Sequence, residues 1–157
     1  IKKYDNLIVS RSFSKSYSLA GLRIGVAAAQ KDIIDGFLKL KDSYNVDRLA
    51  AAGAHAALLD RKSFLYSTGM VRNNKEYMED RLAALGFEIV PSKANFLFVR
   101  HKSVPAAVLY EKLKENRILV RHFSGDVQQD YIRITVGTMM EIKELSRVLE
   151  RITEAGE

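Results

Sequence analysis

Residues 10–25, SRSFSKSYSLAGLRIG, form a polar segment that lies between two apolar runs of the chain. The segment places Lys15 among serine hydroxyls, and Arg23 follows between two glycines. Hydroxyl groups and a guanidinium donate hydrogen bonds that suit a phosphate, and a lysine amine can be the nucleophile of Schiff-base chemistry. The residues alone leave an alternative, in which a strand leads into a polar turn and both cations lie in water.

Composition and charge are typical of a soluble globular protein. Of the 157 residues, 47% are hydrophobic and 28% are charged, which allows one core, or one domain with part of another. The sequence has no signal peptide and no apolar run near the ~20 residues of a membrane span. The absence of cysteine excludes disulfides and thiolate metal sites and is compatible with the cytosol, so we expect a cytoplasmic protein.

The net charge of +6 permits binding to a polyanion such as nucleic acid. However, the basic residues are spread along the whole chain among nineteen acidic ones. This distribution favours a solvated surface, so we expect neither a nucleic-acid partner nor a membrane partner.

Hydrophobic patterns predict alternating strands and helices. Apolar and alternating runs predict strands at residues 6–12, 23–29, 87–90, 95–99, 118–123 and 131–136, the first two of them buried. Periodic apolar residues predict helices at residues 31–41, 48–59, 62–85, 104–115 and from 139 onward. Turns are expected at residues 91–93 and 124–126.

Cap signals support the helix limits. Asp47 is a suitable N-cap for the second helix, and Gly86 ends the third because glycine adopts the left-handed conformation at little cost. Pro105 fits the first turn of the fourth helix, and Thr138 with Glu141 forms a capping box before the last.

The order of elements predicts an α/β chain in two parts. Two strands and two helices come first, and a β-β-α-β-β-α arrangement follows the long helix. We place the boundary at Arg61, so that residues 1–61 belong to a large α/β domain and residues 62–157 form a small α+β domain. Because the chain opens on Ile1 rather than Met, with two lysines before the first strand, we expect an interior piece of a longer protein.

Two further side chains invite a chemical interpretation. Alternation along residues 131–138 places Arg133 on the strand face opposite Ile132 and Ile134, and a guanidinium on a packed sheet needs an anion. The alternative is an edge-strand arginine in water. His55 has no second metal ligand at a suitable spacing, so we interpret it as a packed or edge histidine and predict no metal site.

The segments SFSK at residues 12–15 and GLRIG at residues 21–25 resemble the lysine segment of fold-type I aminotransferases, which use pyridoxal 5'-phosphate. In that family the lysine binds the cofactor as a Schiff base and acts as general acid and base. The resemblance implies that Lys15 is this catalytic lysine and that the cofactor phosphate is held by Ser12, Ser14 and Arg23. It covers essentially the whole chain, but only the last part of the family sequence.

Within the family, the segments LVR before residue 122 and IRITVGT after residue 131 most resemble histidinol-phosphate aminotransferases. The resemblance implies that Arg133 clamps a substrate carboxylate or an equivalent group, and that Arg121 and Tyr44 contact the substrate phosphate. It also places Asn95 near the substrate. The alternatives are an asparagine that merely begins a strand, and Tyr44 and Tyr17 as core aromatics whose hydroxyls reach water.

The activity implied is transamination between histidinol phosphate and imidazole acetol phosphate, with glutamate and 2-oxoglutarate as the other pair, in histidine biosynthesis. A homodimer is implied for the full-length protein. The alternatives are a threonine-phosphate decarboxylase, an aromatic aminotransferase, or a folded piece without catalysis. The family's acidic partner of the pyridinium nitrogen, its stacking aromatic residue and its glycine-rich loop lie too far before the lysine to fall within this chain, so half of a site is expected.

Overall fold

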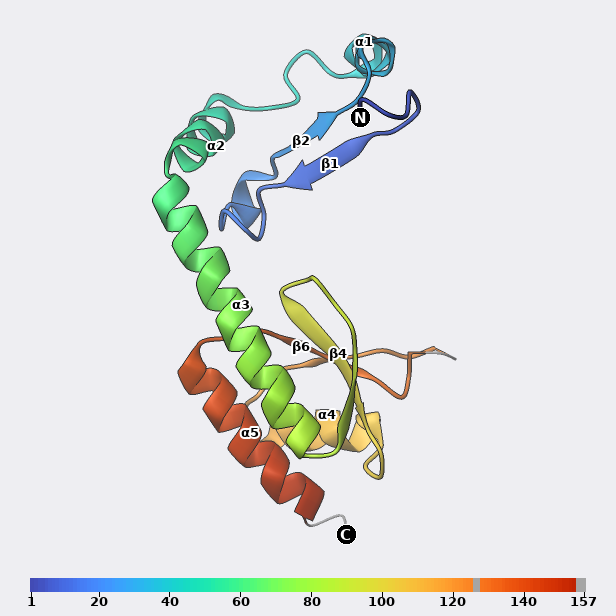
Figure 1. Ribbon diagram of the computed structural model, residues 1–157, viewed down its shortest axis with the longest axis vertical. Helices are drawn as coiled ribbons and strands as arrows, with labels where there is room; N and C mark the ends of the chain where they lie inside the picture. Colours follow the sequence, from blue (N-terminus) through green and yellow to red (C-terminus); the bar gives the residue numbers. More distant parts are fainter. Residues whose placement is uncertain (126–127, 155–157) are drawn as a thin grey trace. The chain divides into compact units, whose positions relative to one another are not determined.

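The computed structural model describes residues 1–125 and 128–154, and its mixed α/β architecture confirms the predicted fold class at this level (Figure 1). By internal contacts the chain forms two compact units, residues 1–68 and 69–157, which divide within helix α3. A two-stranded sheet belongs to unit 1 and a four-stranded sheet to unit 2. Residue 126 of the predicted turn at 124–126 lies outside the described residues.

The helices and strands follow the predicted order. The helices are α1 (Lys31–Leu40), α2 (Arg48–Leu59), α3 (Arg61–Ala84), α4 (Ala106–Glu115) and α5 (Met139–Glu154), with a 3-10 turn η1 (Ala20–Leu22). The strands are β1 (Val9–Ser12), β2 (Gly25–Ala28), β3 (Phe87–Val90), β4 (Phe96–His101), β5 (Arg121–His122) and β6 (Ile132–Thr135). Among the described residues, no helix combines the length and apolar character that a membrane span requires.

The strand predicted at residues 118–123 is shorter than expected. Only Arg121 and His122 pair with β6. The amide of Ile118 donates instead to the carbonyl of Leu113 at 2.9 Å, which satisfies it at the end of α4. The α4 C-terminal turn therefore takes the first residues of the predicted strand.

The two strands of unit 1 form an antiparallel pair, but they are exposed rather than buried. The exposed fraction is 37% for Val9 and 54% for Val26. Among the described residues β1 and β2 pair only with each other, so the prediction of buried strands is wrong for unit 1. Their approach is close, because a Cβ on Gly25 would lie 2.8 Å from the carbonyl oxygen of Arg11.

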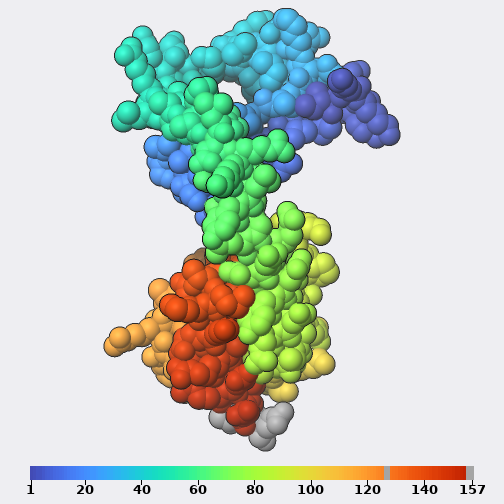
Figure 2. Space-filling view, turned by 60° about the vertical axis from the view of Figure 1, so that its left-hand side comes forward, coloured from blue at the N-terminus to red at the C-terminus, as the bar shows by residue number. Residues whose placement is uncertain are grey.

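The sheet of unit 2 has the order β3-β4-β6-β5, and each neighbouring pair is antiparallel. One face is buried under helices α3, α4 and α5. Its core comprises Met78, Leu82, Phe87, Leu97, Val99, Val104, Ala106, Leu109, Leu113, Ile132, Ile134, Val136, Ile142, Leu145, Val148 and Leu149. Figure 2 shows α5 lying along the C-terminal half of α3, where Arg81 and Glu150 form an ion pair.

The predicted helix ends are largely confirmed. The Asp47 carboxylate accepts from the Ala50 amide at 2.8 Å, and Gly86 has a φ of +82° after α3. Pro105 is the N-cap of α4 rather than a first-turn residue, because the helix begins at Ala106. The capping box is present, since the Glu141 carboxylate accepts from the Thr138 amide at 2.7 Å.

This capping box predicts a pH dependence of stability. The Thr138 amide and hydroxyl both donate to the Glu141 carboxylate and hold the pKa of Glu141 below its ordinary value. A depressed carboxyl pKa stabilises the fold above the unfolded-state pKa of about 4.3, and this stabilisation is lost as the pH falls through the folded-state pKa. Denaturant unfolding of the wild type and Glu141→Gln should therefore differ most near neutral pH and converge in acid. A difference that does not change with pH would contradict this role of the charge.

Candidate functional site

The β1–β2 hairpin, which we call the lysine hairpin (residues 9–28), organises the hydroxyl residues before the lysine. The Ser12 hydroxyl donates to the Ser14 hydroxyl oxygen at 2.8 Å and accepts from the Ser14 amide at 3.0 Å. One step beyond the ladder, the Phe13 amide donates to the Ile24 carbonyl at 3.2 Å. The two predicted phosphate-binding hydroxyls are therefore adjacent.

Lys15 lies in the loop that follows, and its side chain is exposed in unit 1. Its carbonyl accepts from the Ser18 amide at 3.1 Å. Phe13 anchors the loop, since it is 3% exposed and its ring lies 4.9 Å from that of Tyr17. Tyr17 in turn stacks on Phe64 at 4.7 Å, so the interpretation of Tyr17 as a packed aromatic residue holds.

Arg23 is exposed and has a left-handed backbone, with φ at 51°. Its Nη1 donates to the Ala20 carbonyl at 3.0 Å, which leaves further donors of the guanidinium for a ligand. Two hydroxyls and one guanidinium on the same hairpin are a donor set that fits a phosphate group. The chemistry of these donors is therefore compatible with the phosphate group of pyridoxal 5'-phosphate, the cofactor that the resemblance implies.

Tyr44 and His55 lie elsewhere in unit 1. Tyr44 follows α1 and is 92% exposed, so its interpretation as a core aromatic is wrong. His55 is exposed on α2 rather than packed. Across residues 1–125 and 128–154, no three His, Cys, Asp or Glu side chains are grouped as a metal site would need.

The predicted substrate arginines lie in unit 2 on adjacent strands. Ile132 and Ile134 are buried and Arg133 is exposed, which confirms the predicted alternation. The argument that Arg133 needs an anion assumed a packed environment, and this assumption is wrong, because Arg133 is exposed on the face of the sheet opposite the core. Arg121 is directly opposite Arg133 in the β5–β6 register, so the two side chains leave the same face.

Aromatic rings surround the two guanidinium groups. The Arg133 Cζ lies 5.1 Å from the ring centroid of Phe96 and 5.8 Å from that of Phe123. The Arg121 Cζ lies 5.4 Å from the Phe123 centroid. We call this surface the arginine face, and it comprises Phe96, Phe98, Arg121, Phe123, Tyr131 and Arg133.

These rings were not among the residues predicted from the sequence, although a signal was present. The run NFLFV at residues 95–99 alternates, so that burial of Leu97 and Val99 turns Phe96 and Phe98 to the face of Arg133.

Asn95 directly precedes β4. A backbone hydrogen bond fixes its position, since its carbonyl accepts from the Val136 amide at 3.0 Å. Two buried side chains of α3 hold the flanking segments. Lys75 Nζ donates to the carbonyls of Ser92 and Ala94, the latter at 3.2 Å. Asn74 Nδ2 donates to the Gly137 carbonyl at 2.9 Å.

This network ties the turn before Asn95 and the end of β6 to the long helix. Lys75 is 9% exposed, which is rare for a charged residue unless it is hydrogen-bonded. The sequence shows two polar residues in a helix, but it does not show that their partners are backbone carbonyls so far along the chain.

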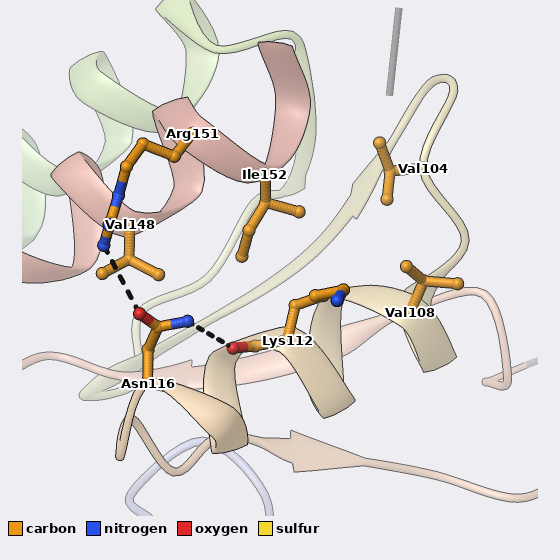
Figure 3. A pocket seen from close by; sticks show the side chains of 7 residues that line it. All are labelled: Val104, Val108, Lys112, Asn116, Val148, Arg151 and Ile152. Atoms are coloured by element: carbon orange, nitrogen blue, oxygen red, sulfur yellow. Dashed lines mark hydrogen bonds between the residues drawn. The ribbon is translucent and has the colours of Figure 1, made fainter. Parts of the chain in front are cut away.

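A separate pocket of about 330 Å³ lies between α4 and α5 (Figure 3). Its lining is Val104, Val108, Lys112, Asn116, Val148, Arg151 and Ile152. None of the predicted site residues lines it.

The predicted site residues are divided between the two units. Unit 1 carries the lysine hairpin and Tyr44, and unit 2 carries Asn95 and the arginine face.

Comparison with known proteins gives one consistent family. The family described as aminotransferase class I and II matches residues 1–152. A histidinol-phosphate aminotransferase from Synechocystis sp. is 46% identical over 145 residues, which cover 92% of this chain and 42% of that protein.

Solved structures of related enzymes share the fold. The histidinol-phosphate aminotransferase from Sinorhizobium meliloti in complex with pyridoxal-5'-phosphate matches with a TM-score of 0.83 and 26% identity, covering 96% of this chain and 42% of that one. The L-threonine-O-3-phosphate decarboxylase from Porphyromonas gingivalis matches with a TM-score of 0.81 and 30% identity, covering 98% and 49%. The chain thus spans less than half the length of these relatives.

Proposed function

The chain belongs to the class I and II aminotransferases, and on that premise we propose that it is the C-terminal part of a histidinol-phosphate aminotransferase. The reaction exchanges the amine of histidinol phosphate with 2-oxoglutarate, giving imidazole acetol phosphate and glutamate, in histidine biosynthesis in the cytoplasm. The observation that carries this proposal is the in-register pair of Arg121 and Arg133 on one sheet face. Two adjacent guanidinium groups suit a phosphate dianion better than one.

The family uses pyridoxal phosphate, the cofactor present in the Sinorhizobium meliloti structure. In the proposed site, Ser12, Ser14 and Arg23 would hold the phosphate of this cofactor, and the amine of Lys15 would bind its reactive end. When bound, the cofactor supplies an electron sink for the bonds at the substrate Cα. The amine of Lys15 would move the proton at that carbon, as general base and then general acid.

The substrate contacts follow from the arginine face and two further residues. Arg133 binds the anionic group that each substrate carries, which is a carboxylate in glutamate and the phosphate in histidinol phosphate. Arg121 and Tyr44 add contacts to the substrate phosphate, and Asn95 lies near the reacting end. These assignments are supported by the exposure of Arg121 and Arg133 and by the fixed backbone of Asn95.

We further propose that residues 1–61 are the last segment of the large cofactor-binding domain and that residues 62–157 are the small domain. The exposed apolar side chains of unit 1 support this assignment, since Val26 is 54% exposed and Leu38 is 55% exposed. Such side chains are expected to pack against the rest of a large domain. In the full-length enzyme we expect a homodimer.

A second candidate is a phosphothreonine decarboxylase, favoured by the 30% identity to the Porphyromonas gingivalis enzyme. Its substrate also carries a phosphate, so the arginine face suits both reactions. The two differ in the bond broken at Cα, which is to hydrogen in transamination and to the carboxylate in decarboxylation.

The first test is an assay of the full-length protein with histidinol phosphate, phosphothreonine and phenylalanine, each with 2-oxoglutarate. Transamination of histidinol phosphate should be fastest, and Lys15→Ala should lower it by at least roughly a hundredfold, because the proton carrier is removed. The folded state, followed by circular dichroism, should be unchanged. Near-normal turnover by Lys15→Ala would refute the assignment, and carbon dioxide release from phosphothreonine would select the second candidate.

The second test separates the two arginines by single-turnover rates in each half-reaction. Arg121→Ala should weaken histidinol phosphate binding about tenfold to a hundredfold, corresponding to ~1.5–3 kcal/mol for a charge-assisted hydrogen bond, and affect glutamate less. Arg133→Ala should damage both half-reactions, because each substrate has an anionic group to clamp. Equal losses from Arg121→Ala in both half-reactions would argue for a general or aromatic aminotransferase.

A further inference from the structure

Arg121 and Arg133 face an electrostatic problem that the sheet itself does not solve. They are directly opposite each other on neighbouring antiparallel strands, and both are exposed. Like charges in this position repel, so the two flexible side chains would separate in water. A site that uses both arginines therefore needs a further group that holds the two guanidinium groups close together.

Phe123 has the position and the chemistry for this task. It follows β5 directly, two residues after Arg121, at the arginine face. Its ring centroid lies 5.4 Å from the Cζ of Arg121 and 5.8 Å from that of Arg133. The electron-rich ring thus attracts both cations, which offsets part of their mutual repulsion.

The ring of Phe123 is itself held in place. It packs edge-on against Phe98 at 5.9 Å, and Phe98 stacks on Tyr131 at 4.6 Å with the rings 12° apart. Phe123 is half-buried, whereas both arginines are exposed. The ring is therefore an anchored platform rather than a third mobile side chain.

The two arginines depend on this platform unequally. Arg133 also lies over Phe96, with its Cζ 5.1 Å from that ring centroid, whereas Phe123 is the one ring near Arg121 among the described residues. Loss of the Phe123 ring would leave Arg133 with a second aromatic partner and Arg121 with none. Its effect should consequently fall on the substrate that needs Arg121.

We propose that Phe123 is a positioning residue that holds Arg121 beside Arg133 and so sets the preference for a phosphorylated substrate over a dicarboxylate. The inference rests on the proposed function for the identity of the substrates. The underlying interaction is a phosphate dianion bound by two guanidinium groups that one ring holds together. It would apply to any phosphorylated amine substrate.

The test compares three variants of the full-length holoenzyme. Phe123→Leu should raise the KM for histidinol phosphate about twofold to fivefold, the size expected when the exposed Arg121 loses its cation–π contact, with kcat and the glutamate half-reaction little changed because Arg133 keeps its contact with Phe96. Phe123→Tyr keeps the ring and should restore the wild-type KM. Phe96→Leu is the matched control, because the Phe96 ring lies near Arg133 and not near Arg121. It should therefore affect both half-reactions to a similar extent.

Binding of inorganic phosphate to the holoenzyme, measured by calorimetry, provides a readout that does not require turnover. Phe123→Leu should weaken it, and adding Arg121→Ala to Phe123→Leu should weaken it little more than Arg121→Ala alone. If histidinol phosphate is not a substrate but these phosphate data hold, the proposed function fails and the role of Phe123 stands. Unchanged phosphate affinity in Phe123→Leu, equal losses for both substrates, or no rescue by Phe123→Tyr would overturn the inference.

Discussion

The antiparallel pairing of β4 with β6 is the constraint on which unit 2 depends. Leu97 opposes Ile134 with both side chains buried, and the next pair, Phe98 with Arg133, must then face outward because side chains alternate along a strand. A shift of one residue in the β4–β6 register would bury Arg133 and expose the core residues. Such a shift would lose apolar burial and desolvate a charge, and both effects destabilise the fold. The packing of the core thereby fixes the orientation of the arginine face.

The lysine hairpin of unit 1 is held by local contacts instead. Buried Phe13, the serine pair and the hydrogen bond from Phe13 to Ile24 fix the loop that carries Lys15. Unit 2 has a core of its own, whereas every residue of β1 and β2 is exposed. Unit 1 thus carries Lys15 on a locally ordered loop, and unit 2 carries the arginine face on a packed sheet.

The helices and their ends could be predicted from the sequence because their signals are local, as the Asp47 cap and the φ of Gly86 confirm. The exposure of β1 and β2 could not be predicted, because an apolar run indicates that a strand is suited to burial but does not show which part of the protein covers it. The face of Arg121 depends on its pairing with Arg133, and the role of Lys75 depends on carbonyls of another segment. Such tertiary facts are absent from residue patterns, whereas the alternation that places Phe96 and Phe98 was present and overlooked.

Lys15 is the residue on which the proposed chemistry depends, and one measurement addresses it without relying on any substrate. The full-length protein would be incubated with pyridoxal phosphate, reduced with borohydride and mapped by peptide mass spectrometry. Because the amine that binds the cofactor covalently becomes irreversibly labelled, we predict a stoichiometric adduct on Lys15 that is absent from Lys15→Ala. A label spread over surface lysines, or an adduct of the same stoichiometry in Lys15→Ala, would contradict the assignment.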